Sequence, residues 1–236
     1  MQVHSFIFNW RGQYEKTKEK EQQFSDLGVK LTIINSDEAH DDEGWVNVGE
    51  DAYLTAQFTK ALELFDGDIL FAIMADVSYD KWGPLIDDAL KYCAKYNWGV
   101  YAPNVDYTWY DSSRADIDTV KLQDENLKMV GCPDCLCWFI RKDIIDEMKQ
   151  RGVDMSPYKM GWGWDLVLPA ISFINARPVI RDYNHKVHHP EGTNYSKVQA
   201  ENEMKALFNS LTPDLQSLFY AIKGPRNMLS QCFRRS

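Results

Sequence analysis

Segments typical of strands and of helices alternate along the first hundred residues, and no other feature of the sequence constrains the fold as strongly. Apolar runs rich in β-branched residues predict four strands, at residues 3–8, 29–34, 69–74 and 99–102. Amphipathic stretches predict three helices between these strands, at residues 14–27, 50–65 and 81–96. Helices that connect consecutive strands cover the faces of a sheet, so this half predicts an α/β fold with a mostly parallel sheet.

The alternation becomes less regular after Pro103. Residues 104–134 are polar and aromatic and have no strong period. The later pattern predicts strands at 135–140 and 178–183 and helices at 142–150 and 164–174. It also predicts two C-terminal helices within 196–222, separated at Thr212-Pro213.

The composition argues against several classes of protein. The formal net charge of −9 disfavours a protein that binds polyanions through a general basic surface. The longest apolar stretch, residues 69–75, is far shorter than a membrane span of roughly 20 residues. Residues 1–9 lack a basic leader, and five cysteines, an odd number, suit a reducing compartment. We therefore expect a cytoplasmic protein, located in the host cytoplasm if it is viral.

Polar residues gather where the predicted strands of the first half end. The segment Asn9-Trp10-Arg11-Gly12 has neither the three-glycine dinucleotide pattern nor the phosphate loop with its lysine, which disfavours Rossmann dehydrogenases and P-loop enzymes. Instead, Asn35-Ser36-Asp37 follows the second strand and Asp76-Val77-Ser78-Tyr79-Asp80 follows the third. A carboxylate at the end of a strand can hold Mg²⁺ or Mn²⁺, and the ion can also bind the phosphates of a substrate. A single acidic residue at a strand end is, however, more often only a turn former.

Further candidate residues lie in the second half. Gly161-Trp162-Gly163-Trp164-Asp165 precedes a predicted helix, where Asp165 is suited to be a general base or, alternatively, only the N-cap of the helix. His185, His188 and His189 follow a predicted strand, and a histidine beside a carboxylate site is a plausible further metal ligand. Tryptophans offer flat faces to sugars or bases, but they equally fill cores.

The order of these segments resembles that of the GT-A glycosyltransferases, most closely the large inverting family two group, over about residues 3–190. The resemblance rests on the strand end at Asn9 to Arg11, Asp37, the Asn47-Val48-Gly49 turn, residues 66–76 before the family's DxD motif, the Gly161-to-Asp165 element and the late histidines. The DxD position departs from the family, because it has the sequence Asp76-Val77-Ser78. Either Asp80 compensates for the missing carboxylate, or Asp76 holds the metal with waters and a histidine.

The resemblance implies a GT-A fold, with a nucleotide-binding, mostly parallel central sheet flanked by helices and a helical C-terminal segment. It implies one domain over residues 1–236, in which 1–103 bind a nucleotide-sugar, 104–195 bind the acceptor and 196–236 form the C-terminal helices. The implied reaction moves a sugar from a nucleotide diphosphate sugar, with a UDP-sugar expected, to a hydroxyl of a glycan or glycoprotein. The implied stereochemistry is inversion, and the implied cofactor is Mn²⁺ or Mg²⁺.

The resemblance also implies roles for individual residues. Asp165 would be the catalytic base. The nucleotide-sugar would contact Asn9, Arg11, Asp37, Gln57, Asp76, Val77 and Ser78. The metal would be held by Asp76, Ser78, His188 and His189. The acceptor would contact Trp109, Asp134, Trp162 and Trp164.

Two alternative functions stay open from the sequence. One is a virus-type transferase that modifies a hydroxymethylated base in DNA, which the basic residues Arg226, Arg234 and Arg235 favour and the net charge of −9 disfavours. The other is an inactive module that binds nucleotide-sugars or glycans, which the incomplete DxD motif favours.

Overall fold

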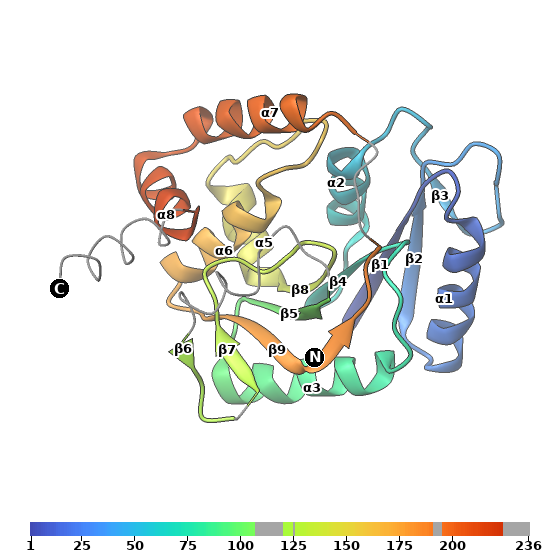
Figure 1. The fold of residues 1–236 in the computed structure, drawn as a ribbon, viewed down its shortest axis with the longest axis horizontal. Coiled ribbons are helices and arrows are strands. Elements are labelled where there is room, and N and C mark those ends of the chain that lie inside the picture. Colours follow the sequence, from blue (N-terminus) through green and yellow to red (C-terminus); the bar gives the residue numbers. More distant parts are fainter. Residues whose placement is uncertain (107–119, 125, 191–194, 224–236) are drawn as a thin grey trace.

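The computed structural model describes residues 1–106, 120–124, 126–190 and 195–223. In this part of the chain, nine strands form one sheet in the order β3-β2-β1-β4-β8-β5-β9-β7-β6, and helices cover both of its faces (Figure 1). The strands are β1 (Val3–Asn9), β2 (Lys30–Asn35), β3 (Val46–Asn47), β4 (Ile69–Met74), β5 (Val100–Val105), β6 (Val120–Lys121), β7 (Leu127–Met129), β8 (Cys137–Arg141) and β9 (Val179–Val187). The helices are α1 (Tyr14–Asp26), α2 (Leu54–Leu64), α3 (Trp82–Tyr96), α5 (Lys142–Gln150), α6 (Trp164–Ile174), α7 (Lys197–Ser210) and α8 (Pro213–Lys223).

Each strand and helix predicted from the sequence is present, and the α/β class is confirmed. The pairings among β1, β2, β3 and β4 are parallel, as predicted, and so is the pairing of β5 with β9. The sheet as a whole is mixed, because β8 runs antiparallel between β4 and β5, and β7 and β6 add antiparallel pairs at the edge. The sequence pattern predicted a mostly parallel sheet and gave no direction for β8, whose antiparallel course follows from its pairing with β4 and β5.

Alternating side chains along the strands divide the core into two layers. On β4, Leu70 and Ala72 pack in the layer of α2, α5 and α6, whereas Phe71 and Ile73 pack in the layer of α1 and α3. Both faces of the sheet are therefore apolar, which explains why the strand reads as a continuous apolar run. Within the described residues, no helix has the length and apolar character needed to span a bilayer.

The C-terminal helices support the loop before α6. Leu207 of α7 and Phe219 of α8 belong to the same apolar layer as α6. Gly163, the N-cap of α6, has a φ of 114°, and a Cβ atom at this position would lie 2.5 Å from Cδ2 of Leu207. Only glycine allows both this backbone conformation and this close approach.

Replacing Gly163 by alanine should therefore destabilise the protein by about 2–4 kcal/mol, from backbone strain and overpacking together. Gly152 provides a matched control, because its φ is also positive, at 67°, but nothing lies within 4 Å of an added Cβ. Gly152→Ala should cost only about 1 kcal/mol. Urea unfolding of both variants measures the difference, and equal losses would contradict the packing of α7 against this loop.

Candidate active site

The polar strand ends meet at one edge of the sheet. β1, β2 and β4 run parallel, β5 runs parallel to β9, and β8 runs antiparallel between the two groups, so that it begins where the others end. We call this the carboxyl edge. In open α/β sheets, ligands usually bind at this edge. It carries the residues that follow β1, β2, β4, β5 and β9, together with those just before β8.

Asn9 and Gln57 lie buried at this edge, and both take part in a network that joins the ends of β1 and β2. Asn9 Nδ2 donates to Asn35 Oδ1 at 2.7 Å, and Asn9 Oδ1 accepts from the Thr17 hydroxyl at 2.7 Å. Gln57 Nε2 donates to the Asn9 carbonyl at 2.6 Å. These contacts shape the loops at the carboxyl edge. Direct contact of Asn9 and Gln57 with a donor stays a prediction.

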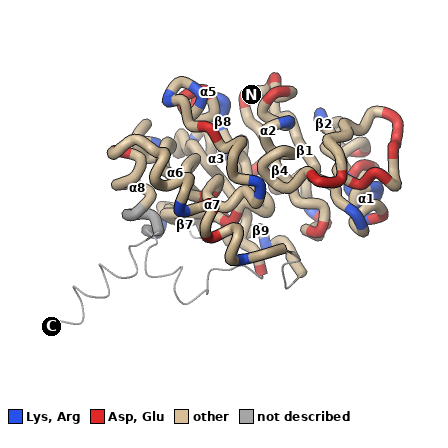
Figure 2. Tube along the Cα trace, turned by 90° about the horizontal axis from the view of Figure 1, so that it is seen from above, with Lys and Arg blue, Asp and Glu red and all other residues tan. Residues whose placement is uncertain are grey.

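Asp37 contacts His40, one ring of an aromatic pair, and lies in the loop between β2 and β3. Figure 2 shows this loop as a run of acidic positions. The Asp37 carboxylate is 1% exposed and lies 2.9 Å from His40 Nδ1, and the His40 ring stacks on Tyr14 with centroids 3.9 Å apart. Burial raises the pKa of Asp37. Hydrogen bonds from His40 and a backbone N–H, together with the charge of Arg11, lower this pKa by more, so the pKa of Asp37 lies below its usual value. Arg11 itself is exposed and pairs with Glu50.

Asp76 and His189 face each other at the carboxyl edge. His189 Nε2 lies 3.3 Å from Asp76 Oδ2, and both side chains are mostly buried. Asp76 Oδ1 is also buried and has no hydrogen-bond partner among the described residues. A buried carboxylate oxygen without a partner costs free energy, which a bound cation would offset. The sequence left two alternatives for the missing carboxylate of the DxD motif: compensation by Asp80, or a metal held by Asp76 with a histidine. The structure shows a contact between Asp76 and a histidine, whereas Asp80 is exposed.

The backbone joins the segment after β4 to the end of β9. The Ser78 N–H donates to the His188 carbonyl at 2.8 Å, and the His188 N–H donates back to Ser78 at 2.9 Å. Val77, between Asp76 and Ser78, is fully buried. Of the four predicted metal ligands, Asp76 and His189 are therefore in side-chain contact, whereas Ser78 and His188 are paired through their backbone and the His188 imidazole faces Asp106. Their coordination of a metal stays a prediction.

Asp106 is a further carboxylate at this edge, and the sequence analysis did not single it out. Its Oδ2 lies 2.6 Å from His188 Nδ1, and its Oδ1 accepts the His189 N–H at 3.0 Å. Burial lowers the pKa of His189, but Asp76, then Asp134 and Asp106, raise it above its ordinary value. The available signal was the polar residue after β5, which was missed because the predicted strand ended at residue 102, before Val105.

Asp165 lies in the first turn of α6 and is 7% exposed. Gly163 is the N-cap, so Asp165 does not occupy the N-cap position, although its carboxylate accepts backbone N–H groups at the start of α6. Burial and the charge of Asp134 raise the pKa of Asp165 to about 7, against lowering contacts from the backbone and Cys132, whose Sγ lies 3.7 Å from Oδ2. Asp134 influences the pKa of both Asp165 and His189, which shows that these two groups border one negative region.

The tryptophans predicted to contact the acceptor differ in their surroundings. Trp162 is half-buried and donates from Nε1 to the Tyr195 hydroxyl at 2.7 Å. Tyr195 is close enough to Asp134 and Asp165 to feel their charge, so it is a further candidate that the sequence analysis missed. Trp164 is 2% exposed and packs against Phe58 in the core. Trp109 lies outside the described residues.

Lys20 is a buried cation near Asp76. Its Nζ donates to the Ala75 carbonyl at 2.7 Å, directly before Asp76 in the chain. Burial lowers the pKa of Lys20 to about 8. The sequence signal was its position on the buried stripe of α1, three residues after Thr17 and four before Phe24.

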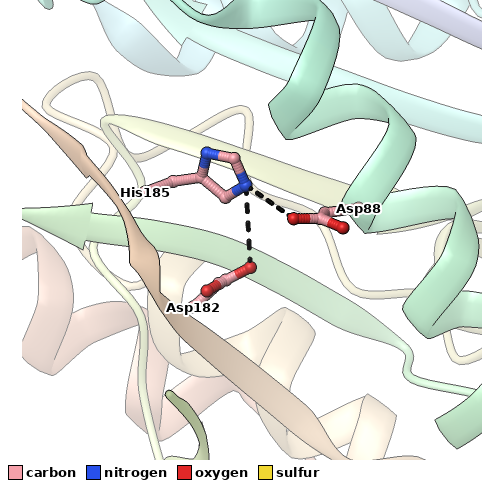
Figure 3. Close-up of side chains that lie close together, drawn as sticks. All are labelled: Asp88, Asp182 and His185. Atoms are coloured by element: carbon pink, nitrogen blue, oxygen red, sulfur yellow. Dashed lines mark hydrogen bonds and ion pairs between the residues drawn. The ribbon is translucent and has the colours of Figure 1, made fainter. Parts of the chain in front are cut away.

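A separate group of potential metal ligands lies between α3 and β9. Asp88, Asp182 and His185 each offer a ligand atom, and the three atoms lie within 4.8 Å of one another. Figure 3 shows His185 Nε2 facing both carboxylates, at 3.0 Å from Asp88 Oδ2 and 3.9 Å from Asp182 Oδ2. His185 belongs to the late histidines of the sequence pattern, but its imidazole faces this group rather than Asp76.

Comparisons with known proteins identify the fold. The crystal structure of GalNAc-T7 with UDP, GalNAc and Mn²⁺ matches with a TM-score of 0.62 at 11% identity, covering 97% of this chain and 51% of that chain. S. aureus TarS 1–349 matches with a TM-score of 0.61 at 10% identity, covering 98% of this chain and 74% of that chain. TarS in complex with UDP-GlcNAc gives a TM-score of 0.56 at 11% identity, with 98% and 76% coverage.

These likenesses show that the chain has the GT-A fold, as the sequence predicted. The chain spans about half the length of the GalNAc-T7 chain and about three quarters of the TarS chain. No protein-family model and no curated protein sequence matches it.

The raised pKa of Asp165 makes a prediction about stability. Because the folded pKa of about 7 exceeds the ordinary value of 3.8, the native state binds the proton more tightly, and stability should fall as pH rises from about 4 through 7. Asp165→Asn should remove this fall and be more stable than wild type at pH 8, on the order of 2–4 kcal/mol. Urea unfolding from pH 4 to pH 8 measures it.

The matched control is Asp87→Asn, which changes an exposed carboxylate and should leave the pH dependence as in wild type. A parallel pH dependence in Asp165→Asn and wild type would show that Asp165 is ionised at its usual pH in the native state.

Proposed function

We propose that this chain is a glycosyltransferase that moves a sugar from a UDP-sugar to a hydroxyl of a glycan or glycoprotein. The observation that carries the proposal is the placement of an Asp76–His189 pair and a buried Asp165 at the carboxyl edge of a GT-A sheet. The same fold occurs in GalNAc-T7, whose structure holds UDP, GalNAc and Mn²⁺, and in TarS, whose structure holds UDP-GlcNAc.

The residues at the edge fit a divalent cation. Carboxylate and imidazole together suit Mn²⁺, and the buried Oδ1 of Asp76 offers a further oxygen. Asp76 and His189 would hold the ion, and Ser78 and His188 complete the proposed ligand set. When bound, the ion supplies electrostatic stabilisation of the leaving diphosphate. Asp106 hydrogen-bonds His188 and the His189 backbone, and so keeps these histidines in place.

Residues 1–103 form the proposed donor side. The stacked Tyr14 and His40 rings offer a flat surface beside Asp37, and Arg11 is exposed close to it. Asp37 would orient the base or ribose, with the uridine next to the aromatic pair. Asn9 and Gln57 support the backbone around this position.

Residues 104–195 form the proposed acceptor side, where Asp165 removes the proton from the attacking hydroxyl. A general base works best when its pKa lies near the working pH, and the pKa of Asp165 is raised to about 7. Trp162 and Tyr195 contact each other, Tyr195 lies within the electrostatic influence of Asp165, and the two rings would offer an aromatic surface for a sugar. One displacement by a base-activated hydroxyl inverts the anomeric carbon.

The first test compares two carboxylates of the same turn. Wild type with MnCl₂ should show a rise in melting temperature with a UDP-sugar and should slowly release UDP. Asp76→Asn should lose the Mn²⁺-dependent part of both signals, with UDP release lower by on the order of 10²-fold. Asp80→Asn, the control, alters an exposed carboxylate and should behave as wild type.

Equal signals in Asp76→Asn and wild type would contradict the proposed metal site. A rise in melting temperature without UDP release under any condition would instead indicate that the chain is an inactive module that binds nucleotide-sugars.

A second test separates catalysis from donor binding. Asp165→Asn should bind the UDP-sugar with Mn²⁺ as wild type does, since Asp165 lies on the acceptor side. Transfer to a glycan acceptor, found by array screening, should fall about 10²–10⁴-fold, as expected for loss of a general base. Cys132→Ala serves as the control, because it changes the neighbour of Asp165 without removing the carboxylate. Transfer at the wild-type rate in Asp165→Asn would exclude Asp165 as the base.

A further inference from the structure

Residues 76–80 are fixed to the end of β9 at three points. Asp76 contacts His189, and Ser78 forms the backbone bridge with His188. The third contact is made by Tyr79, whose hydroxyl lies 2.7 Å from Nδ1 of His185. The first two contacts involve predicted metal ligands, whereas the third has no assigned role.

A β-bulge aims His185 at Tyr79. The register between β5 and β9 passes from Pro103 opposite Asp182 to Asn104 opposite Lys186, so β9 contains additional residues between them. Before the bulge, the even-numbered Ile180 belongs to the α3 layer of the core, and after it the odd-numbered Val187 does. The bulge therefore reverses which residues face α3 and places His185 on the same side as Asp182.

The neighbours of His185 fix its orientation and tautomer. Its Nε2 faces Asp88 and Asp182, so this nitrogen carries the hydrogen and donates it. Nδ1 is then the acceptor for the Tyr79 hydroxyl. Both carboxylates have further donors, since Lys91 contacts Asp88 and the Tyr101 hydroxyl donates to Asp182. The group shown in Figure 3 is thus a hydrogen-bonded network that holds the imidazole in place.

We propose that His185 is a positioning residue for the candidate metal site, because it binds the Tyr79 hydroxyl and thereby holds residues 76–80 against the end of β9. Its effect on metal binding rests on the proposed function, which takes Asp76 and His189 as ligands. The β-bulge and the two carboxylates of the network serve to keep His185 in the orientation that accepts from Tyr79.

The first experiment measures amide hydrogen exchange without metal. Tyr79→Phe and His185→Gln both remove the contact with Nδ1, and each should speed exchange of the Ser78 amide about five- to tenfold. Tyr158→Phe is the matched control, because it removes a tyrosine hydroxyl contact with Ser210 elsewhere in the fold. It should leave Ser78 exchange unchanged. Wild-type exchange at Ser78 in both test variants would overturn the proposal.

The second experiment titrates MnCl₂ and follows free Mn²⁺ by electron paramagnetic resonance. Tyr79→Phe and His185→Gln should raise the Mn²⁺ Kd about tenfold or more, as for other residues that orient metal ligands. His185→Asn retains an acceptor near the position of Nδ1 and should lose less affinity than His185→Gln. The double variant Tyr79→Phe/His185→Gln should be no weaker than either single variant, because the two residues share one contact.

The outcomes separate the two proposals. If wild type binds no Mn²⁺, the proposed function fails, and the amide exchange alone decides whether His185 positions residues 76–80. If wild type binds Mn²⁺ and the test variants bind it equally well, the positioning role fails while the proposed function stands. A bound ion that persists in Asp76→Asn but is lost in Asp182→Asn would show that the Asp88, Asp182 and His185 group is itself a metal site, which also overturns the proposal.

Discussion

The candidate active site depends on the pair of backbone hydrogen bonds between Ser78 and His188. This bridge joins the turn after β4 to the end of β9, two segments that are far apart in the sequence. Because backbone hydrogen bonds set both distance and direction, the bridge brings Asp76 and His189, which lie on the same side of it, into contact. Lys20 holds the same turn through the Ala75 carbonyl. The geometry of the proposed metal site therefore depends on this backbone pairing.

Several carboxylates lie near the contact between Asp76 and His189, and burial raises the free energy of their ionised forms. Asp134 raises the pKa of Asp165 and contributes to the raised pKa of His189, so one electrostatic potential acts on both proposed chemical groups. The same potential favours a cation at Asp76. Positive charge that enters this edge should therefore change the protonation of Asp165, which would couple the proposed donor side to the proposed acceptor side.

The sequence predicted the strands, the helices and the residues at the carboxyl edge because each leaves a local signal. Short strands such as β3 and β6 leave none, since two residues show no period and form only where a neighbouring strand offers a ladder. Asp106 was missed because the predicted strand ended at residue 102, whereas Tyr195 and the bulge that turns His185 toward α3 leave no local signal. Their roles follow from contacts between distant segments, which pattern along one chain does not reveal. Trp164 shows the converse, because a residue in a conspicuous motif lies in the core.

The departure from the DxD motif bears on which ion the proposed metal site would favour. Mg²⁺ takes oxygen ligands and keeps several waters, whereas imidazole nitrogen suits first-row transition ions. The structure places the His189 imidazole 3.3 Å from Asp76, whereas the second position of the motif is an exposed serine. The sequence analysis named Mn²⁺ first, with Mg²⁺ as the alternative, and a carboxylate–imidazole pair also favours Mn²⁺. In the proposed site, serine at position 78 would leave one carboxylate, Asp76, with the His189 imidazole beside it.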